Sequence, residues 1–267
     1  MKSFAFHSPE TVPDAFALLN DVSESKLLAG GMTLLPTIKQ RLAEPAALID
    51  LAKIPQLSEI AVDEDALVIG AMVRHVDVVT SALVRSKVPM LVHLASGIGD
   101  PAVRNRGTIG GSVANNDPSA DYPAAVLALD AIIVTDRREI PASTFFTGLF
   151  ETSLEPSEII TSIRFPIPST AGYAKFKSPA SRYAVVGVCV AKAGGSVRVA
   201  VTGSGPCVFR VPEMETALET SFEPAAIASI KIGAAGLNSD IHADAEYRAH
   251  LITVMAKKAV AAAIQGL

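Results

Sequence analysis

LLAGGMTLLP, from Leu27 to Pro36, places two glycines between a short apolar run and a helical pattern, and RNRGTIGGSVANNDPSADYP, from Arg104 to Pro123, contains a second pair. A strand that leads through glycines into a helix can leave consecutive backbone N–H groups pointing at one spot, where the helix dipole adds positive potential. Hydroxyls flank the second pair in Thr108-Ile109-Gly110-Gly111-Ser112 and can donate to phosphate oxygens. The two loops together predict a site for a pyrophosphate.

Each loop alone is weak support for a nucleotide site. A Gly-Gly between a strand and a helix is usually only a tight turn, and Thr-Ile-Gly-Gly is also compatible with a β-bulge. The chain contains neither GxGxxG nor GxxxxGK[ST], so the Rossmann and P-loop explanations are unsupported. A phosphate site in this chain therefore requires another nucleotide-binding fold.

Working outward, the flanking patterns alternate between short strands and helices. Ser8 and Pro9 suit the N-cap and first position of a helix whose apolar residues follow at helical spacing. Lys26 to Ala29 and Ala47 to Leu51 predict strands on either side of a helix at Leu34 to Leu42, which makes a βαβ-like unit. Further predicted elements are a hairpin of Leu57–Ala61 and Ala66–Ala71, helices at Val88–Gly97, Pro123–Leu129, Pro212–Glu219, Ala225–Ile230 and Glu246–Ile264, and strands at Ala131–Val134, Arg182–Lys192 and Ser196–Thr202.

The segment from Gly99 to Tyr122 has little hydrophobic periodicity and is expected to lack regular structure. So long a stretch within a compact domain is more often functional than idle. Prolines at Pro156, Pro166 and Pro168 mark a candidate domain boundary, after which the composition becomes β-rich. We expect a first domain over residues 1–165 and a second, smaller α+β domain over residues 166–267.

Composition excludes several classes of protein. A length of 267 residues with 49% hydrophobic content favours a globular protein of one to two domains, and a net charge of −4 without a basic cluster argues against nucleic-acid binding. The start of the chain lacks a signal-peptide pattern, and no apolar run is long enough for a transmembrane segment, so we expect a cytoplasmic protein. The two cysteines and five histidines are not spaced as metal ligands, so we predict no metal site in this chain.

The two glycine motifs closely resemble the flavin-pyrophosphate motifs of the medium subunits of aerobic carbon monoxide dehydrogenase and of the xanthine dehydrogenase (molybdenum hydroxylase) family. EIITSIRFPIP and NSDIHADAEYRAHLITVMAKKAV, together with the segment from Tyr173 to Val190, resemble the C-terminal domain of these flavoproteins. The resemblance covers nearly the whole chain. It implies a vanillyl-alcohol-oxidase-like (PCMH-type) FAD-binding fold of two α/β subdomains, about 1–53 and 54–165, plus the C-terminal α+β domain.

The resemblance also implies which residues contact FAD. Ile98 matches an apolar position near the flavin, Asp121 an acidic residue that bonds the cofactor, and Ile160 an apolar or backbone contact. Lys177 matches a basic residue close to the flavin ring, and Tyr183 an aromatic beside it in the carbon monoxide dehydrogenase branch. The two pyrophosphate loops comprise Ala29, Gly30, Gly31, Met32, Thr33 and Leu34, and Thr108, Ile109, Gly110, Gly111 and Ser112.

Three of these residues have an ordinary structural alternative. Lys177 near a reduced flavin would stabilise its negative charge, but a lysine is also a common solvated surface residue. Asp121 can accept hydrogen bonds from the cofactor or act as the N-cap of the helix that follows it. Tyr183 either shields a flavin face or fills the core of the second domain.

The first loop departs from the family pattern at two positions. Met32 stands where relatives usually carry a polar residue, and Thr33 replaces the common serine but keeps its hydroxyl. Because Met32 cannot form the histidyl flavin link of some relatives in the wider fold, we expect FAD to be non-covalent.

The function implied by the resemblance is electron transfer, without a catalytic residue in this chain. The partners implied are a small subunit with [2Fe–2S] clusters and a large subunit with the molybdenum cofactor, assembled as a dimer of heterotrimers. The final acceptor (NAD, a quinone, a cytochrome or dioxygen) and the substrate (carbon monoxide, a purine, an aldehyde or an N-heterocycle) stay open. Two alternatives also stay open, a self-sufficient FAD-dependent oxidase or dehydrogenase and a flavin-free scaffold subunit.

Overall fold

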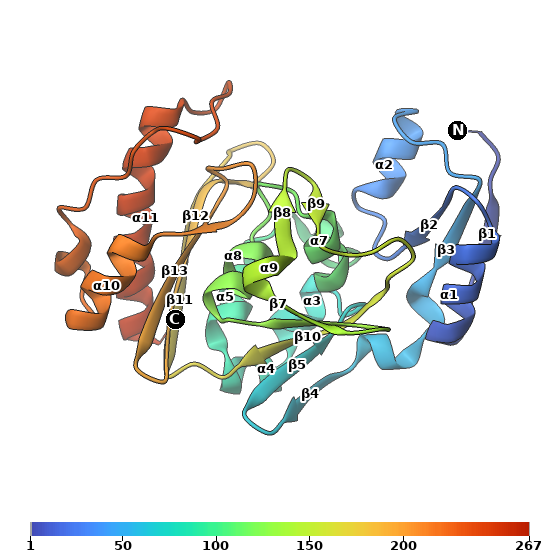
Figure 1. Cartoon of the computed structure of the whole chain (residues 1–267), viewed down its shortest axis with the longest axis horizontal. Coiled ribbons are helices and arrows are strands. Elements are labelled where there is room, and N and C mark those ends of the chain that lie inside the picture. Colours follow the sequence, from blue (N-terminus) through green and yellow to red (C-terminus); the bar gives the residue numbers. More distant parts are fainter. Residues whose placement is uncertain (1, 267) are drawn as a thin grey trace.

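The computed structural model describes residues 2–266 as a mixed α/β structure with three principal sheets. Figure 1 shows the sheets following one another along the long axis, with the N-terminal sheet at the right and the C-terminal sheet at the left. No helix among residues 2–266 is long and apolar enough to cross a bilayer.

The N-terminal unit is built on a parallel three-stranded sheet in the order β1-β3-β2. The predicted βαβ unit is confirmed, because β2 and β3 are parallel neighbours joined through α2. The elements are β1 (Ala5–His7), α1 (Val12–Asp21), β2 (Ser25–Leu28), α2 (Leu34–Lys39) and β3 (Ala47–Asp50), followed by the 3₁₀ turns η1 (Leu51–Lys53) and η2 (Pro55–Ser58).

The predicted start of the first helix at Ser8 is wrong. Helix α1 begins at Val12, since the Thr11 hydroxyl accepts a hydrogen bond from the amide of Asp14 and donates one to its carboxylate. The cap therefore lies three residues later than predicted, Pro13 is the proline of the first turn, and the reciprocal contact of Thr11 and Asp14 stabilises that start.

The central unit contains an antiparallel sheet in the order β4-β5-β10-β6-β7, and the predicted hairpin is its first strand pair. Helices α5 and α8 belong to its core, which includes the fully buried rings of Tyr122, Phe145 and Phe165. The strands are β4 (Ile60–Asp63), β5 (Ala66–Gly70), β6 (Ile132–Thr135), β7 (Glu139–Pro141) and β10 (Ile160–Pro166), with a small hairpin of β8 (Phe146–Gly148) and β9 (Glu151–Thr152). The helices are α3 (His75–Thr80), α4 (Ala82–Lys87), α5 (Pro89–Ser96), α6 (Pro101–Arg104), α7 (Ile109–Asn115), α8 (Tyr122–Ala128) and α9 (Ala142–Phe145).

The expectation that Gly99 to Tyr122 lacks regular structure is wrong, because the segment contains α6 and α7. These helices are too short to show hydrophobic periodicity. Each is instead marked by a side-chain cap, from Asp100 to the amide of Val103 and from Thr108 to the amide of Gly111.

The C-terminal unit packs helix α11 across an antiparallel sheet in the order β11-β12-β13-β14. The contact is close: a Cβ at Gly172 of β11 would lie 2.1 Å from the carbonyl oxygen of Ala259 of α11. The predicted helix near Ala225 is only a 3₁₀ turn. The elements are β11 (Thr170–Lys177), β12 (Ala184–Ala193), β13 (Ser196–Thr202), β14 (Phe209–Arg210), α10 (Pro212–Thr220), η3 (Pro224–Ile227) and α11 (Ala245–Gln265).

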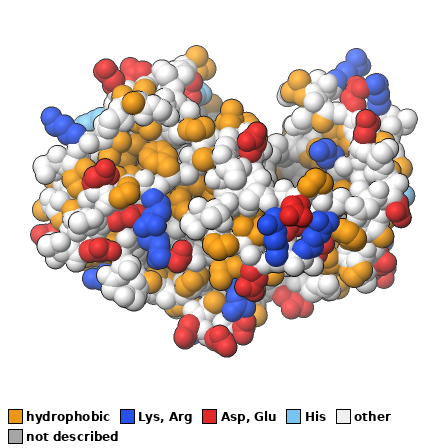
Figure 2. Space-filling view, viewed as in Figure 1, with side chains coloured by type: hydrophobic (Ala, Val, Ile, Leu, Met, Phe, Trp, Pro, Cys, Tyr) orange, Lys and Arg blue, Asp and Glu red, His pale blue; other side chains and the backbone are white. Residues whose placement is uncertain are grey.

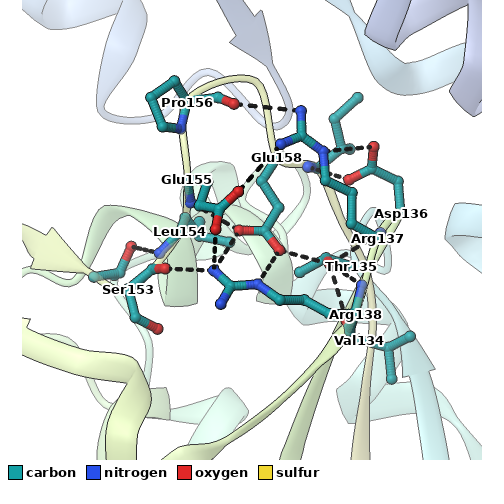
Figure 3. Close-up of polar contacts among 12 residues, drawn as sticks. Val134, Thr135, Asp136, Arg137, Arg138, Ser153, Leu154, Glu155, Pro156 and Glu158 are labelled. Atoms are coloured by element: carbon teal, nitrogen blue, oxygen red, sulfur yellow. Dashed lines mark hydrogen bonds and ion pairs between the residues drawn. The ribbon is translucent and has the colours of Figure 1, made fainter.

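A polar cluster ties the β6–β7 turn to the segment that leads into β10 (Figure 3). The buried Glu158 carboxylate accepts hydrogen bonds from the Arg138 guanidinium at 2.9 Å, the Thr135 hydroxyl at 2.8 Å and the amide of Glu155 at 2.7 Å. These bonds, with the one from Arg138 contributing most, lower the pKa of Glu158 to about 2. Arg137 of the same turn lies 5.0 Å from the ring centroid of Phe16, so the cluster also contacts helix α1 of the N-terminal unit.

Candidate cofactor-binding site

The two glycine loops, at residues 29–34 and 108–112, meet in the structure although they are far apart in the sequence. A Cβ built on Gly30 would lie 2.1 Å from the carbonyl oxygen of Arg106 and 2.7 Å from the Cα of Gly107. A Cβ on Gly111 would lie 3.5 Å from the Cβ of Ala29. The backbones therefore touch at a distance that only glycine at position 30 permits, which brings both predicted loops into one site.

The surface is hollowed where the N-terminal and central units meet. Figure 2 shows the hollow between the smaller lobe at the right and the rest of the molecule, in the region where Figure 1 places α2 opposite α7 and the β8–β9 hairpin. Both glycine loops lead directly into the helices that face each other there. An extended ligand in this hollow would contact both units.

The first loop offers free backbone donors. Within residues 2–266, no amide from Ala29 to Leu34 has a hydrogen-bond acceptor, and the Thr33 side chain makes no cap bond at the start of α2. Gly31 adopts a positive φ of 73°, which turns the chain between β2 and α2. Consecutive free amides in such a turn are able to bind an anion, so the predicted anion-binding role of this loop stays a prediction. Met32 in the same loop is 39% exposed.

The second loop differs, because four of its five amides already have acceptors within the chain. Residues 107–110 run antiparallel to residues 71–75, and the Arg74–Thr108 bridge lies at the centre of this pairing. The amides of Ile109, Gly110, Gly111 and Ser112 donate to Val73 O, Ala71 O, Thr108 Oγ1 and Thr108 O. Within residues 2–266, what this loop still offers an anion is the amide of Thr108, which has no acceptor, and the hydroxyl hydrogens of Thr108 and Ser112. Its glycines serve close packing, since a Cβ on Gly110 would lie 2.5 Å from the Cβ of Ala71.

Two buried polar groups without hydrogen-bond partners lie beneath the second loop. His75 is 4% exposed, its Nδ1 has no hydrogen-bond partner within residues 2–266, and its Nε2 would lie 2.6 Å from a Cβ on Gly107. The ring of Tyr122 lies 5.4 Å away, and its hydroxyl is also unpartnered. Burial, with a smaller contribution from Arg104, lowers the pKa of His75 to about 4, so the imidazole is neutral near pH 7.

Sequence reasoning missed a buried ion pair at the junction of the central and C-terminal units. The Nζ atom of Lys175 lies 2.8 Å from the Asp121 carboxylate, which also accepts a hydrogen bond from the Tyr173 hydroxyl. Both charged side chains are nearly inaccessible to solvent. Burial raises the pKa of Asp121, and the Lys175 ammonium and the Tyr173 hydroxyl oppose that rise. Strand alternation was the available signal, because Tyr173, Lys175 and Lys177 share one face of β11.

The interpretation of Asp121 as a helix cap is wrong. Asp121 does precede α8, but its side chain makes no cap hydrogen bond and points instead to Tyr173 and Lys175. Desolvation of a carboxylate at this position requires a cation, and Lys175 supplies it.

The other predicted contacts fall into different environments. Ile98 is half-buried against the central core, and Ile160 is buried within it at the start of β10. Lys177 is exposed at the end of β11, and Tyr183 is 46% exposed beside β12. A pocket of about 250 Å³ separates the end of α5 from β11, lined by His93, Leu94, Ser96, Gly97, Tyr173, Lys175, Lys177 and Arg182. The structure brings Lys177 to this pocket, whereas Ile160 belongs to the core.

Comparison with known proteins agrees with this geometry. Residues 2–168 match the family described as the FAD binding domain in molybdopterin dehydrogenase. The chain is 37% identical over 279 residues to the carbon monoxide dehydrogenase medium chain of Hydrogenophaga pseudoflava, covering 97% of this chain and 96% of the relative. It belongs to the FAD-binding medium subunits of the molybdenum hydroxylases.

Two further relatives support this family assignment. The nicotine 6-hydroxylase medium subunit of Paenarthrobacter nicotinovorans is 36% identical over 275 residues, with 97% of each chain covered. A solved structure of the carbon monoxide dehydrogenase of H. pseudoflava superposes with a TM-score of 0.89 at 37% identity, covering 99% of this chain and 98% of that one. The resemblance stated from the two glycine motifs is thereby confirmed over the whole chain. Members of this family are subunits of oxidoreductases, and their cofactor is FAD.

The residues present fit that cofactor. A pyrophosphate needs several donors within a short distance, and the free amides of residues 29–34 face the loop that carries the Thr108 and Ser112 hydroxyls. Among residues 2–266, no group of three or more His, Cys, Asp and Glu side chains is placed to hold a metal ion.

Proposed function

We propose that this chain carries FAD non-covalently and relays electrons from [2Fe–2S] clusters of a partner subunit to an external acceptor. The observation that carries the proposal is the contact between Gly30 and the backbone of Arg106 and Gly107, which brings a row of free amides together with the hydroxyls of the second loop. Such an arrangement suits a pyrophosphate stretched between two subdomains, as in the PCMH-type fold that we propose for residues 1–165.

In this proposal the pyrophosphate accepts hydrogen bonds from the first-loop amides, from Ala29 to Leu34, and from the hydroxyls of Thr33, Thr108 and Ser112. The glycines of both loops allow the two backbones to approach. Ile98, Lys177 and Tyr183 would contact the flavin ring, and Lys175 would hold Asp121 beside it. The proposed role of Ile160 is to support Ile98 from the core, since both belong to the same apolar cluster.

The proposed partners follow from the relatives, which are named as medium chains or subunits of carbon monoxide dehydrogenase and nicotine 6-hydroxylase. We propose a small iron–sulfur subunit and a large molybdenum-cofactor subunit, assembled as a dimer of heterotrimers. Bound FAD supplies the conversion of single-electron input into two-electron output. The residues of this chain bind and orient the cofactor, and substrate contacts belong to the large partner.

The test is anaerobic mixing of the FAD-loaded chain with its iron–sulfur partner, whose clusters have been reduced chemically beforehand. The proposal predicts loss of the flavin absorbance near ~450 nm, where an oxidised flavin cofactor absorbs, only when the reduced partner is present. Rapid bleaching of the isolated chain by small alcohols would instead show a self-sufficient dehydrogenase. A wild-type chain that stays without FAD even in the assembled complex would show a scaffold subunit.

A further inference from the structure

Three consecutive carbonyl groups after helix α5 each accept a hydrogen bond from a cationic side chain. Lys175 Nζ lies 2.9 Å from Gly97 O, Arg104 NH1 lies 3.0 Å from Ile98 O, and Arg182 NH1 lies 3.2 Å from Gly99 O. The C-terminal end of a helix favours cations, because its carbonyls lack intrahelical partners and carry the negative end of the dipole. The segment from Gly97 to Gly99 is therefore fixed from three sides.

The Lys175 ammonium joins this segment to two other parts of the chain. Besides Gly97 O, it contacts the Asp121 carboxylate before α8 and lies 2.9 Å from Arg182 O in the β11–β12 turn. An ammonium has three hydrogens to donate, and each has an acceptor here. Because the side chain is only 9% exposed, water cannot easily replace these partners.

The β11–β12 turn is closed by its own backbone. The amide of Ser178 donates to Tyr183 O at 2.8 Å, and the amide of Arg182 donates to Ser178 O at 2.9 Å. Arg182 has a positive φ of 62°, a conformation that is uncommon for a non-glycine residue. The contacts of Lys175 with the Arg182 carbonyl, and of the Arg182 side chain with Gly99 O, fix it here.

We propose that Lys175 is a positioning residue, which holds Ile98 on one side and the turn bearing Tyr183 on the other at the spacing required by the flavin ring. This inference rests on the proposed function, which places both residues at the ring. Asp121 has the supporting role of balancing the buried ammonium. Lys175 acts through the residues it holds and takes no part in electron transfer.

The first experiment measures hydrogen exchange in the FAD-free chain. The variants are Lys175→Met, Asp121→Asn and the double variant, with Lys258→Met as a control that removes the same charge from an exposed position of α11. The inference predicts faster exchange of the hydrogen-bonded amides of residues 97, 98, 178 and 182 in Lys175→Met and in the double variant. Asp121→Asn should retain most of the protection, because Lys175 keeps both carbonyl partners.

The double variant also covers the case in which Lys175→Met fails to fold, since it leaves no unpaired charge in the interior. The second experiment measures release of FAD and the flavin midpoint potential in the same proteins. Loss of the charge-assisted hydrogen bonds that hold the residues beside the ring predicts FAD release about tenfold faster in Lys175→Met than in the control. The midpoint potential should also shift in Lys175→Met and stay at the wild-type value in Lys258→Met.

Unchanged exchange of both segments in Lys175→Met would overturn the inference, and so would equal exchange in Asp121→Asn and Lys175→Met, which would mean that the ion pair alone matters. If exchange rises as predicted but the potential and FAD release do not change, Lys175 is a structural residue only. A wild-type complex that takes up no FAD would refute the proposed function itself, and with it the part of the inference that concerns the flavin.

Discussion

The Cα of Gly30 packs so closely against Arg106 that a Cβ at position 30 would lie 2.1 Å from the Arg106 carbonyl oxygen. This contact joins the first glycine loop, in the N-terminal unit, to the second, in the central unit. Real Cβ atoms do not approach a backbone oxygen so closely, so any side chain at position 30 must push the two loops apart.

Gly30→Ala should therefore reduce both stability and FAD binding. We expect a loss of about 2 kcal/mol in the free energy of unfolding from the forced backbone shift, and FAD binding weaker by at least about tenfold. Gly233→Ala is the matched control, because a Cβ there meets no atom within 4 Å. Urea unfolding and fluorescence titration with FAD measure the two effects. Equal behaviour of the two variants would show that the contact does not define the site.

The two loop threonines should separate a structural hydroxyl from a binding one. Thr108 Oγ1 accepts the amide of Gly111 and caps α7, whereas Thr33 makes no cap bond. Thr108→Val should cost about 1 kcal/mol of stability, and Thr33→Val should leave stability within about 0.5 kcal/mol. Both should weaken FAD binding if both hydroxyls donate to the pyrophosphate. If Thr33→Val bound FAD with wild-type affinity, the Thr33 hydroxyl would not be part of the binding site.

His75 should make stability fall as the pH drops from about 6.5 to about 4. Its pKa in the folded chain is about 4, below the usual value near 6.5, so the unfolded chain binds the extra proton first in this range. The contribution amounts to about 3 kcal/mol at most. His75→Leu should flatten that part of the profile, and His250→Leu, at an exposed position of α11, should not. If stability in His75→Leu depended on pH between about 6.5 and 4 as steeply as in the wild type, His75 would not be the group responsible.

Glu158 should also make stability fall as the pH drops, but at lower pH than His75. Its pKa is lowered to about 2, so the stability from its hydrogen bonds with Arg138 and Thr135 is complete above about pH 4.5 and is lost as the pH falls through about 2. Glu158→Gln should cost about 2 kcal/mol at pH 7, because a buried charge-assisted network is broken. Glu155→Gln, at the exposed edge of the same cluster, should cost less than about 0.5 kcal/mol. Similar losses in both variants would contradict the buried role of Glu158.

Sequence reasoning predicted the elements that have strong local signals. The βαβ unit around Gly30 and Gly31, the first hairpin and the long C-terminal helix are confirmed, because apolar periodicity and glycine turns mark them directly. Helices α6 and α7 were missed, since they are too short for periodicity and are set by the caps of Asp100 and Thr108.

The candidate site was predictable where the signal lay in backbone geometry. The glycine pairs indicated two loops that meet, and the structure brings them together. The Lys175–Asp121 pair was not predicted, because strand alternation shows only that Lys175 shares a face of β11 with Tyr173 and Lys177, and tertiary packing brings in Asp121 from 54 positions away. For the same reason the sequence did not show that the second-loop amides of Ile109 and Gly110 are already paired with Val73 and Ala71.

The central claim is that FAD binds without a covalent link between the two glycine loops. The most direct test incubates the purified complex with FAD, removes the excess, and records the absorption spectrum before and after acid release of the nucleotide. The account predicts bands near ~370 and ~450 nm, as expected for an oxidised flavin, with all FAD released by acid, loss of the bands in Gly30→Ala and their retention in Gly233→Ala. A folded wild-type complex without these bands, or with equal bands in Gly30→Ala, would contradict it.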